Sequence, residues 1–111
     1  MQKRSLKELA VEFFETQGYK VKEDEVVKSK YSIDLLIQEG ENILHGVVVK
    51  DWKRTVGVNV LLRLDRAISK AGLQQGIVVG PSFSSHARSY ASKRKIKLVT
   101  YSEVRKHLQL Y

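Results

Sequence analysis

The spacing of apolar residues predicts two long amphipathic helices. Over residues 6–17, apolar side chains recur three and four positions apart, and Ser5 and Glu8 have the spacing of a helix-capping box. Residues 58–71 show the same period and stop at Gly72, a residue favoured just after a helix. Each helix therefore has one apolar face that must pack against the rest of the fold.

Short apolar runs bounded by polar residues predict five β-strands. Two β-branched runs flank the polar turn Glu39–Asn42, which is the pattern of a β-hairpin. The charged run Lys22–Lys30 before them is interpreted as a loop or a ragged strand extension. The predicted strands are 19–21, Ser32–Ile37, Ile43–Val49, Gln75–Gly80 and Ile96–Tyr101.

Two further helices complete the predicted order α-β-β-β-α-β-α-β-α. One follows the polar run Ser82–Ser85 and ends near Arg94, and the other is Glu103–Leu108, capped by Ser102. The first three strands are tightly joined and should be antiparallel, whereas the later strands are separated by helices and should be parallel. The sequence thus predicts an α/β fold, a mixed sheet sandwiched by helices, with residues 1–111 forming a single domain.

Composition narrows the class of protein. A hydrophobic share of 42% with mixed charges indicates a folded core. No stretch approaches the roughly 18–20 apolar residues of a membrane span, and the N-terminus lacks a signal-peptide core. We therefore expect a soluble cytoplasmic protein without membrane contact, and leave association with the nucleoid open. The absence of cysteine excludes disulfides and thiolate metal sites, and the three histidines lack ligand spacing.

The charge is unevenly distributed. Residues 1–49 hold seven Lys and Arg against nine Asp and Glu, whereas residues 50–111 hold thirteen against three. The net charge of +8 therefore comes from the second half of the chain. This asymmetry favours a polyanionic partner, most simply nucleic acid, over a merely solvated basic surface.

Two charged residues interrupt the predicted hairpin. A turn centred near residues 41–42 places Asp34 opposite Val48 and Ser32 opposite Lys50, all on one face of the sheet. Half-buried charges are costly unless they are paired or used. The pair could form a site in which the carboxylate holds Mg²⁺ and the ammonium stabilises charge on a phosphate. A simple ion pair between Asp34 and Lys50 explains the pattern equally well.

Six short segments, taken together in their order along the chain, indicate the type of protein. They are Gly18-Tyr19-Lys20-Val21, Ile33-Asp34-Leu35, Val48-Val49-Lys50-Asp51-Trp52, Gly76-Ile77-Val78-Val79, Phe83-Ser84-x-x-Ala87 and Ile96-Lys97-Leu98-Val99. Together they span nearly the whole chain. Their order and spacing resemble the PD-(D/E)XK nuclease superfamily, most closely its Mrr-like restriction endonuclease branch, with archaeal Holliday-junction resolvases as more distant relatives.

The resemblance implies a metal-dependent endodeoxyribonuclease that uses Mg²⁺ or Mn²⁺ when active. Asp34 would ligate the metal, and Lys50 would be the catalytic lysine. Glu8 would match the acid on the first helix that assists metal binding in many members, although the capping box also accounts for it.

One position departs from the family pattern. The family places Glu, Asp or Gln two residues before the lysine as a second metal ligand, and this chain has Val48 there. Valine offers no oxygen, so a metal would keep one carboxylate and be weakly held. Asp51 follows Lys50 directly and should point to the other face of the sheet. Asp65 lies away from the centre of the basic stripe on its helix, and nothing in the sequence supports it as a replacement.

Basic and aromatic residues around the hairpin are candidates for DNA contact. Lysine and arginine would meet phosphates, and a tryptophan can stack or wedge, so binding should follow the backbone and shape of duplex or branched DNA. For residues around the third helix, Arg88, Lys93, Arg94 and Lys95, contact and solvation are equally balanced. The favoured candidates are Lys50, Trp52, Lys53, Arg54, Arg63, Arg66 and Lys70.

Three functions are compatible with these observations. The first is a DNA-binding protein of the nuclease fold whose cleavage is weak or lost, in which case no cofactor is needed. The second is an active Mg²⁺-dependent endonuclease of restriction or junction-resolving type that uses Asp34 and Lys50. The third is a scaffold subunit of a DNA-processing complex. A homodimer is compatible with the resemblance, and the apolar end Leu108–Tyr111 could contribute to it.

Overall fold

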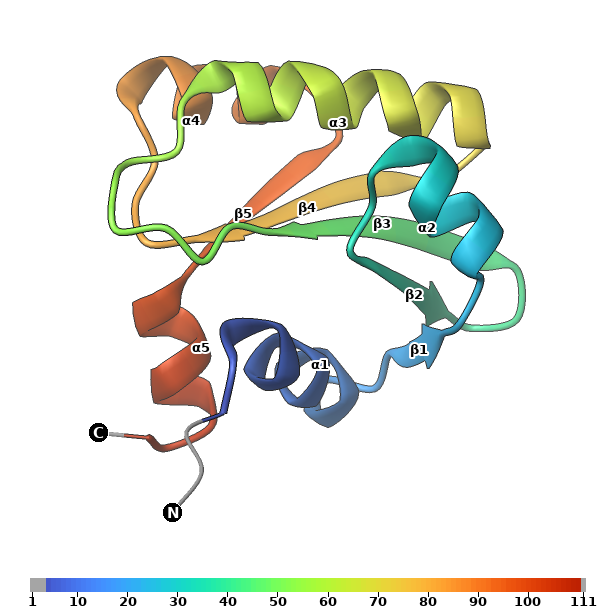
Figure 1. Ribbon diagram of the computed structural model, residues 1–111, viewed down its shortest axis with the longest axis horizontal. Coiled ribbons are helices and arrows are strands. Elements are labelled where there is room, and N and C mark those ends of the chain that lie inside the picture. Colours follow the sequence, from blue (N-terminus) through green and yellow to red (C-terminus); the bar gives the residue numbers. More distant parts are fainter. Residues whose placement is uncertain (1–3, 111) are drawn as a thin grey trace.

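A five-stranded sheet with helices on both faces forms the protein, as seen in a computed structural model that describes residues 4–110 (Figure 1). Among these residues, no helix combines the length and apolar character that spanning a membrane requires. The elements are α1 (Leu6–Thr16), β1 (Lys20–Lys22), α2 (Glu25–Tyr31), β2 (Leu35–Glu39), β3 (Ile43–Val49), α3 (Val58–Ala71), β4 (Gln75–Gly80), α4 (Ser85–Lys93), β5 (Ile96–Thr100) and α5 (Tyr101–His107).

The strands lie in the sheet in the same order as in the chain. β1, β2 and β3 are antiparallel, and β3, β4 and β5 are parallel. Leu35 faces Val47 across the hairpin, which is the register predicted from the turn. The predicted α/β sandwich with a mixed sheet is therefore confirmed.

Two apolar cores cover the two faces of the sheet. α1 and α5 pack on one face, and α3 and α4 pack on the other. Helix α3 approaches the sheet closely at glycine positions. A Cβ atom at Gly76 would lie 2.9 Å from the Leu64 side chain, so only glycine lets the helix sit at this depth.

Helix α2 corrects the prediction of a loop or ragged strand over Lys22–Lys30. Asp24 caps the helix by accepting a hydrogen bond from the Val27 amide. Ser32 ends it in the left-handed conformation, with φ of 55°, so the second strand begins at Leu35 rather than at Ser32. The sequence interpretation missed this helix because its seven residues bury no side chain completely.

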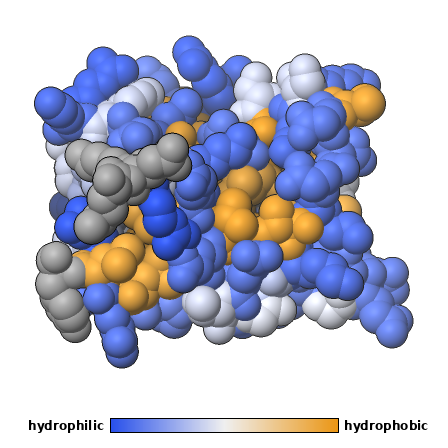
Figure 2. Space-filling model, turned by 60° about the horizontal axis from the view of Figure 1, so that its bottom comes forward, coloured by the Kyte–Doolittle hydropathy of each residue, from blue (hydrophilic) through white to orange (hydrophobic). Residues whose placement is uncertain are grey.

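The C-terminal end also differs from prediction. The last strand stops at Thr100, which caps α5 in a capping box with Glu103, so Ser102 is not the cap. Figure 2 shows the side of the molecule formed by α1 and α5, where apolar patches lie among polar residues. Leu110 is 37% exposed, and Tyr111, which was considered for a dimer contact, lies outside the described residues.

Candidate functional site

Asp34 sits where β2 and β3 separate. Its amide donates to the Val47 carbonyl at 2.9 Å, and its Oδ2 accepts the Val49 amide at 2.7 Å. The strand pairing ends at Leu35, so the carboxylate takes the place of a strand partner for Val49. No described residue bonds the other carboxylate oxygen of Asp34. One oxygen of this carboxylate is therefore structural, and the residue also lines a hollow.

That hollow, with a volume of about 440 Å³, also contains Lys50. The amide of Lys50 donates to the Val79 carbonyl at 2.8 Å, which fixes the residue at the end of β3. In the described part of the chain, Lys50 and Asp34 form no ion pair within 4.0 Å, so the ion-pair interpretation is wrong. Ser32 does not pair with Lys50 in the sheet, yet it lines the same hollow from the end of α2.

Residues that the sequence interpretation did not select complete the hollow. They come from α1 and from the unpredicted α2: Lys7, Glu25, Lys28 and Ser29. The Lys28 side chain is 11% exposed and pairs with Glu25 at 3.0 Å and with Glu23 at 3.2 Å. The hydrogen bond that Lys28 donates to Glu25, followed by the one that it donates to Glu23, raises the pKa of Lys28 against the opposing effect of its burial. The helix cap at Asp24 was the sequence signal that could have predicted α2, and with it the position of the three residues that α2 contributes.

The position of the missing acid lies between the apolar core and a small hollow that Lys50 and Arg63 also line. Val48 is 6% exposed and packs in the core with Val56, Leu61 and Leu64. Glu8 does not line the hollow with Asp34, and its carboxylate accepts the Ser5 hydroxyl at 3.1 Å.

No cluster of three or more metal-ligating side chains occurs within residues 4–110. Two carboxylates line the hollow: that of Asp34 accepts a backbone amide, and that of Glu25 pairs with Lys28. Two carboxylates already engaged in this way are less than hard cations usually require from a protein. The described residues therefore do not fit a carboxylate-held Mg²⁺ site.

The two other aspartates near the site face elsewhere. Asp51 lies in a hollow with Arg4 and Arg105, apart from the one that Asp34 lines. Asp65 accepts the Tyr90 hydroxyl at 2.6 Å and faces Arg94 at 3.8 Å. The hydrogen bond to Asp65 and partial burial raise the pKa of Tyr90. Neither residue supplies an acid beside Asp34.

The loop after β3 concentrates charge around a single aromatic ring. Lys50 Nζ lies 5.2 Å and Arg54 Cζ lies 4.3 Å from the centroid of the Trp52 ring. Trp52 is half-buried against the α3 core, and Lys53 is exposed. The indole thus packs against the core and lies close to two cations. This arrangement is suited to contacts with phosphates and bases.

The basic stripe of α3 lies exposed beside this loop. Arg63, Arg66 and Lys70 are solvent-exposed, and none forms an ion pair with a described residue. Arg63 lines a small hollow together with Lys50 and Val48. Around α4 the cations are more engaged: Arg88 donates to the Phe83 carbonyl, and Arg94 faces Asp65.

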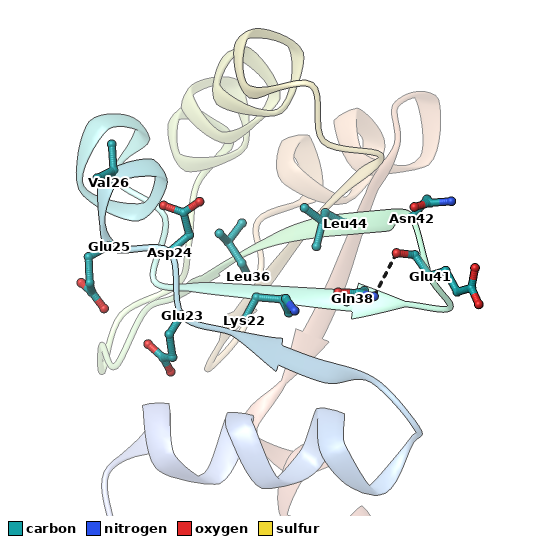
Figure 3. Close-up of a pocket in the computed structure, with 10 residues that line it drawn as sticks. All are labelled: Lys22, Glu23, Asp24, Glu25, Val26, Leu36, Gln38, Glu41, Asn42 and Leu44. Atoms are coloured by element: carbon teal, nitrogen blue, oxygen red, sulfur yellow. Dashed lines mark hydrogen bonds between the residues drawn. The ribbon is translucent and has the colours of Figure 1, made fainter.

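A second, larger hollow lies elsewhere on the described part of the chain and has the opposite charge. It is a groove of about 640 Å³ over the hairpin, with Leu36 and Leu44 in its floor (Figure 3). The start of α2 and the hairpin turn give it an acidic rim. The acidic residues of this rim are Glu23, Asp24, Glu25 and Glu41. Such a rim repels phosphates, so this groove does not extend the basic surface.

The fold is a mixed α/β sandwich with a basic surface beside the end of β3, and comparison of sequences gives its family. The model of the Mrr_cat family, described as restriction endonuclease, matches residues 1–108. The chain therefore belongs to this family of Mrr-like PD-(D/E)XK nucleases. No curated protein matches its sequence.

Solved structures show the same fold. A crystal structure of a protein of unknown function, AF1548, superposes with a TM-score of 0.72 at 15% identity over 95% of this chain and 66% of that one. A complex of EndoMS with double-stranded DNA gives 0.61 at 18% identity, over 89% and 46%. A repair endonuclease from Pyrococcus abyssi gives 0.60 at 17% identity, over 90% and 48%. The chain thus spans about half to two thirds of these structures.

Proposed function

We propose that this protein binds DNA through its nuclease fold and cleaves it weakly or not at all. The observation that carries the proposal is Val48, a buried valine at the position where the family has its second metal-binding acid. Asp34 gives one oxygen to the Val49 amide, and Glu25, the other carboxylate of the hollow, pairs with Lys28, so little is left to replace that acid as a metal ligand. Loss of the ligand set lowers cleavage much more than binding, since DNA affinity rests mainly on cations.

Exposed cations support the DNA-binding part of the proposal. Arg63, Arg66 and Lys70 have no carboxylate partner among the described residues, so their charge is available to phosphates. Lys50 and Lys7 add two ammonium groups around the Asp34 hollow. One structural neighbour was solved with double-stranded DNA, and another is a repair endonuclease. We infer that the partner is duplex or branched DNA, held mainly by its backbone.

A binding and cleavage experiment tests this proposal directly. The protein is incubated with linear, nicked and four-way DNA, with Mg²⁺ or Mn²⁺, and compared with a chelator control. We expect salt-dependent binding that is the same with and without the metal, and little product. Robust cleavage that disappears in both Asp34→Ala and Lys50→Ala would favour the second candidate, an active endonuclease. The specific observation in favour of that candidate is the shared hollow of Asp34 and Lys50.

Restoring the missing acid sharpens the same experiment. Val48→Glu places a carboxylate beside Lys50 and Arg63, at the edge of a hollow that all three residues line. A charge at this buried position should lower the free energy of unfolding by about 3 kcal/mol. We expect Mn²⁺ to recover part of this loss and to bring measurable cleavage. Val48→Met is the matched control, because it has a similar length but no oxygen that could hold a metal.

A further inference from the structure

The loop that carries Lys50, Trp52 and Arg54 is tied to the last helix by one hydroxyl. Tyr101 is the first residue of α5, and its Oη lies 2.5 Å from the Lys50 carbonyl oxygen and 3.1 Å from that of Trp52. A phenol has one proton to donate, so the closer carbonyl takes most of it and the second shares it. The hydroxyl therefore bridges two carbonyls within the first three residues after β3.

Tyr101 is itself firmly placed. Its ring packs against the core under α1 and α5, and the capping box of Thr100 and Glu103 fixes the backbone on either side of it. Burial, followed by the nearby Asp51 carboxylate, raises the pKa of the Tyr101 phenol. The hydroxyl consequently stays protonated at neutral pH and remains a donor to the loop.

The other end of the loop is held from a different element. The Val56 amide donates to the Ser82 carbonyl at 2.9 Å, and the Ser84 amide donates to the Val56 carbonyl at 3.0 Å. The Thr55 and Ser82 hydroxyls are 3.0 Å apart. The Trp52 ring and its two cations, Lys50 and Arg54, therefore lie between the tie to Tyr101 and the ties at Thr55 and Val56, or at the first of them.

We infer that Tyr101 is a positioning residue for DNA binding: its hydroxyl sets the backbone at Lys50 and Trp52 before DNA arrives. The inference rests on the proposed function, and adds a residue that touches neither phosphate nor base. Without the hydroxyl the loop would sample more conformations, and DNA would have to order it on binding. The loss should therefore appear as weaker binding with no loss of an ionic contact.

Tyr101→Phe tests the inference, because it removes the hydroxyl and keeps the buried ring. Trp52 is the only tryptophan of the chain, so its fluorescence reports on this loop alone. In the free protein we expect lower Trp52 anisotropy and stronger quenching by acrylamide. Binding to a labelled 20-base-pair duplex should weaken by about three- to tenfold. The slope of log affinity against log salt should not change, since no phosphate contact is removed.

Tyr90→Phe is the matched control, because it removes a tyrosine hydrogen bond of similar length, to Asp65, away from the loop. It should leave Trp52 anisotropy and DNA affinity at wild-type values. Unchanged anisotropy in Tyr101→Phe would overturn the inference, even if the wild type binds DNA. Changed anisotropy with unchanged affinity would also overturn it, because the tie would then have no role in binding. If wild-type protein binds no DNA, the proposed function fails and the inference fails with it, while the anisotropy still shows whether the tie exists.

Discussion

Two aspartates on the basic side of the molecule, Asp34 and Asp65, use their charges in different ways. Asp65 is occupied by a tyrosine hydroxyl and faces an arginine, so its carboxylate fastens α3 to α4. Asp34 gives Oδ2 to a backbone amide and lines a hollow that also holds lysines. Each carboxylate bonds through Oδ2 alone, so the two differ in their partners and not in the number of oxygens they use. Asp65 joins two helices through side chains, whereas Asp34 holds the backbone at the end of the hairpin.

The largest effect should come from removing the bond that fixes Asp34. Asp34→Ala leaves the Val49 amide without its partner and should lower the free energy of unfolding by about 2 kcal/mol. Asp34→Asn keeps an oxygen that can accept the same amide, and its stability should stay near wild type. Urea denaturation measures both variants. Equal losses in the two variants would mean that the charge of Asp34, not the hydrogen bond, stabilises the hairpin end.

A second prediction compares two groups of basic residues, one on the exposed stripe of α3 and one at the end of α4. Arg63→Ala with Arg66→Ala should weaken duplex binding by about tenfold and reduce the salt slope by about 2, because two phosphate contacts are lost. Lys93→Ala with Lys95→Ala removes the same charge from a hollow that Asp65 lines, and should change affinity and slope much less. Titrations at several salt concentrations measure both. Similar slopes in the two double variants would show that the whole α3 and α4 face meets DNA.

The smallest effect concerns the structural aspartate. Tyr90→Phe should lower stability by about 1 kcal/mol at pH 7, through the lost hydrogen bond to Asp65. Folding raises the pKa of Tyr90 above its usual 10.0, so the stabilisation is complete below pH 10.0 and disappears as the pH rises through the folded-state pKa. Thermal unfolding of the wild type and Tyr90→Phe between pH 7 and 11 measures how their difference in stability changes with pH. A difference that grows with pH would contradict the assignment of this bond.

The main features of the fold could be predicted because they depend on local patterns. The periodicity of residues 58–71 gave α3 with its observed ends, and the polar turn set the hairpin register that Leu35 and Val47 show. These signals are strong because a shift of one residue would turn an apolar face toward water. Helix α2 buries no side chain completely, and its cap at Asp24 is its clearest signal in the sequence. Its apolar side is short, with Val27 and Tyr31 only partly buried, and lies within a charged stretch.

The site was harder to predict, since it depends on contacts between distant segments. The sequence placed Asp34 and Lys50 near each other, and the resemblance drew attention to Val48. Neither indicated that Asp34 would bond the Val49 amide, or that Lys7 rather than Glu8 would line the hollow. The first depends on how β2 and β3 separate, and the second on how α1 meets the sheet, and no local pattern encodes either. The tie from Tyr101 to Lys50 spans 51 positions and was equally invisible.

The sequential strand order has a consequence for how the chain matures. Each strand pairs with the one synthesised just before it, so most of the sheet can form from near neighbours as the polypeptide emerges from the ribosome. Lys50 is an exception, because its amide can form its hydrogen bond only after Val79 has been synthesised, and its carbonyl only after Tyr101 has. The surface that we propose for DNA therefore acquires its final shape late in synthesis. A nascent chain would expose its basic loop in that fixed form only after the last helix has docked.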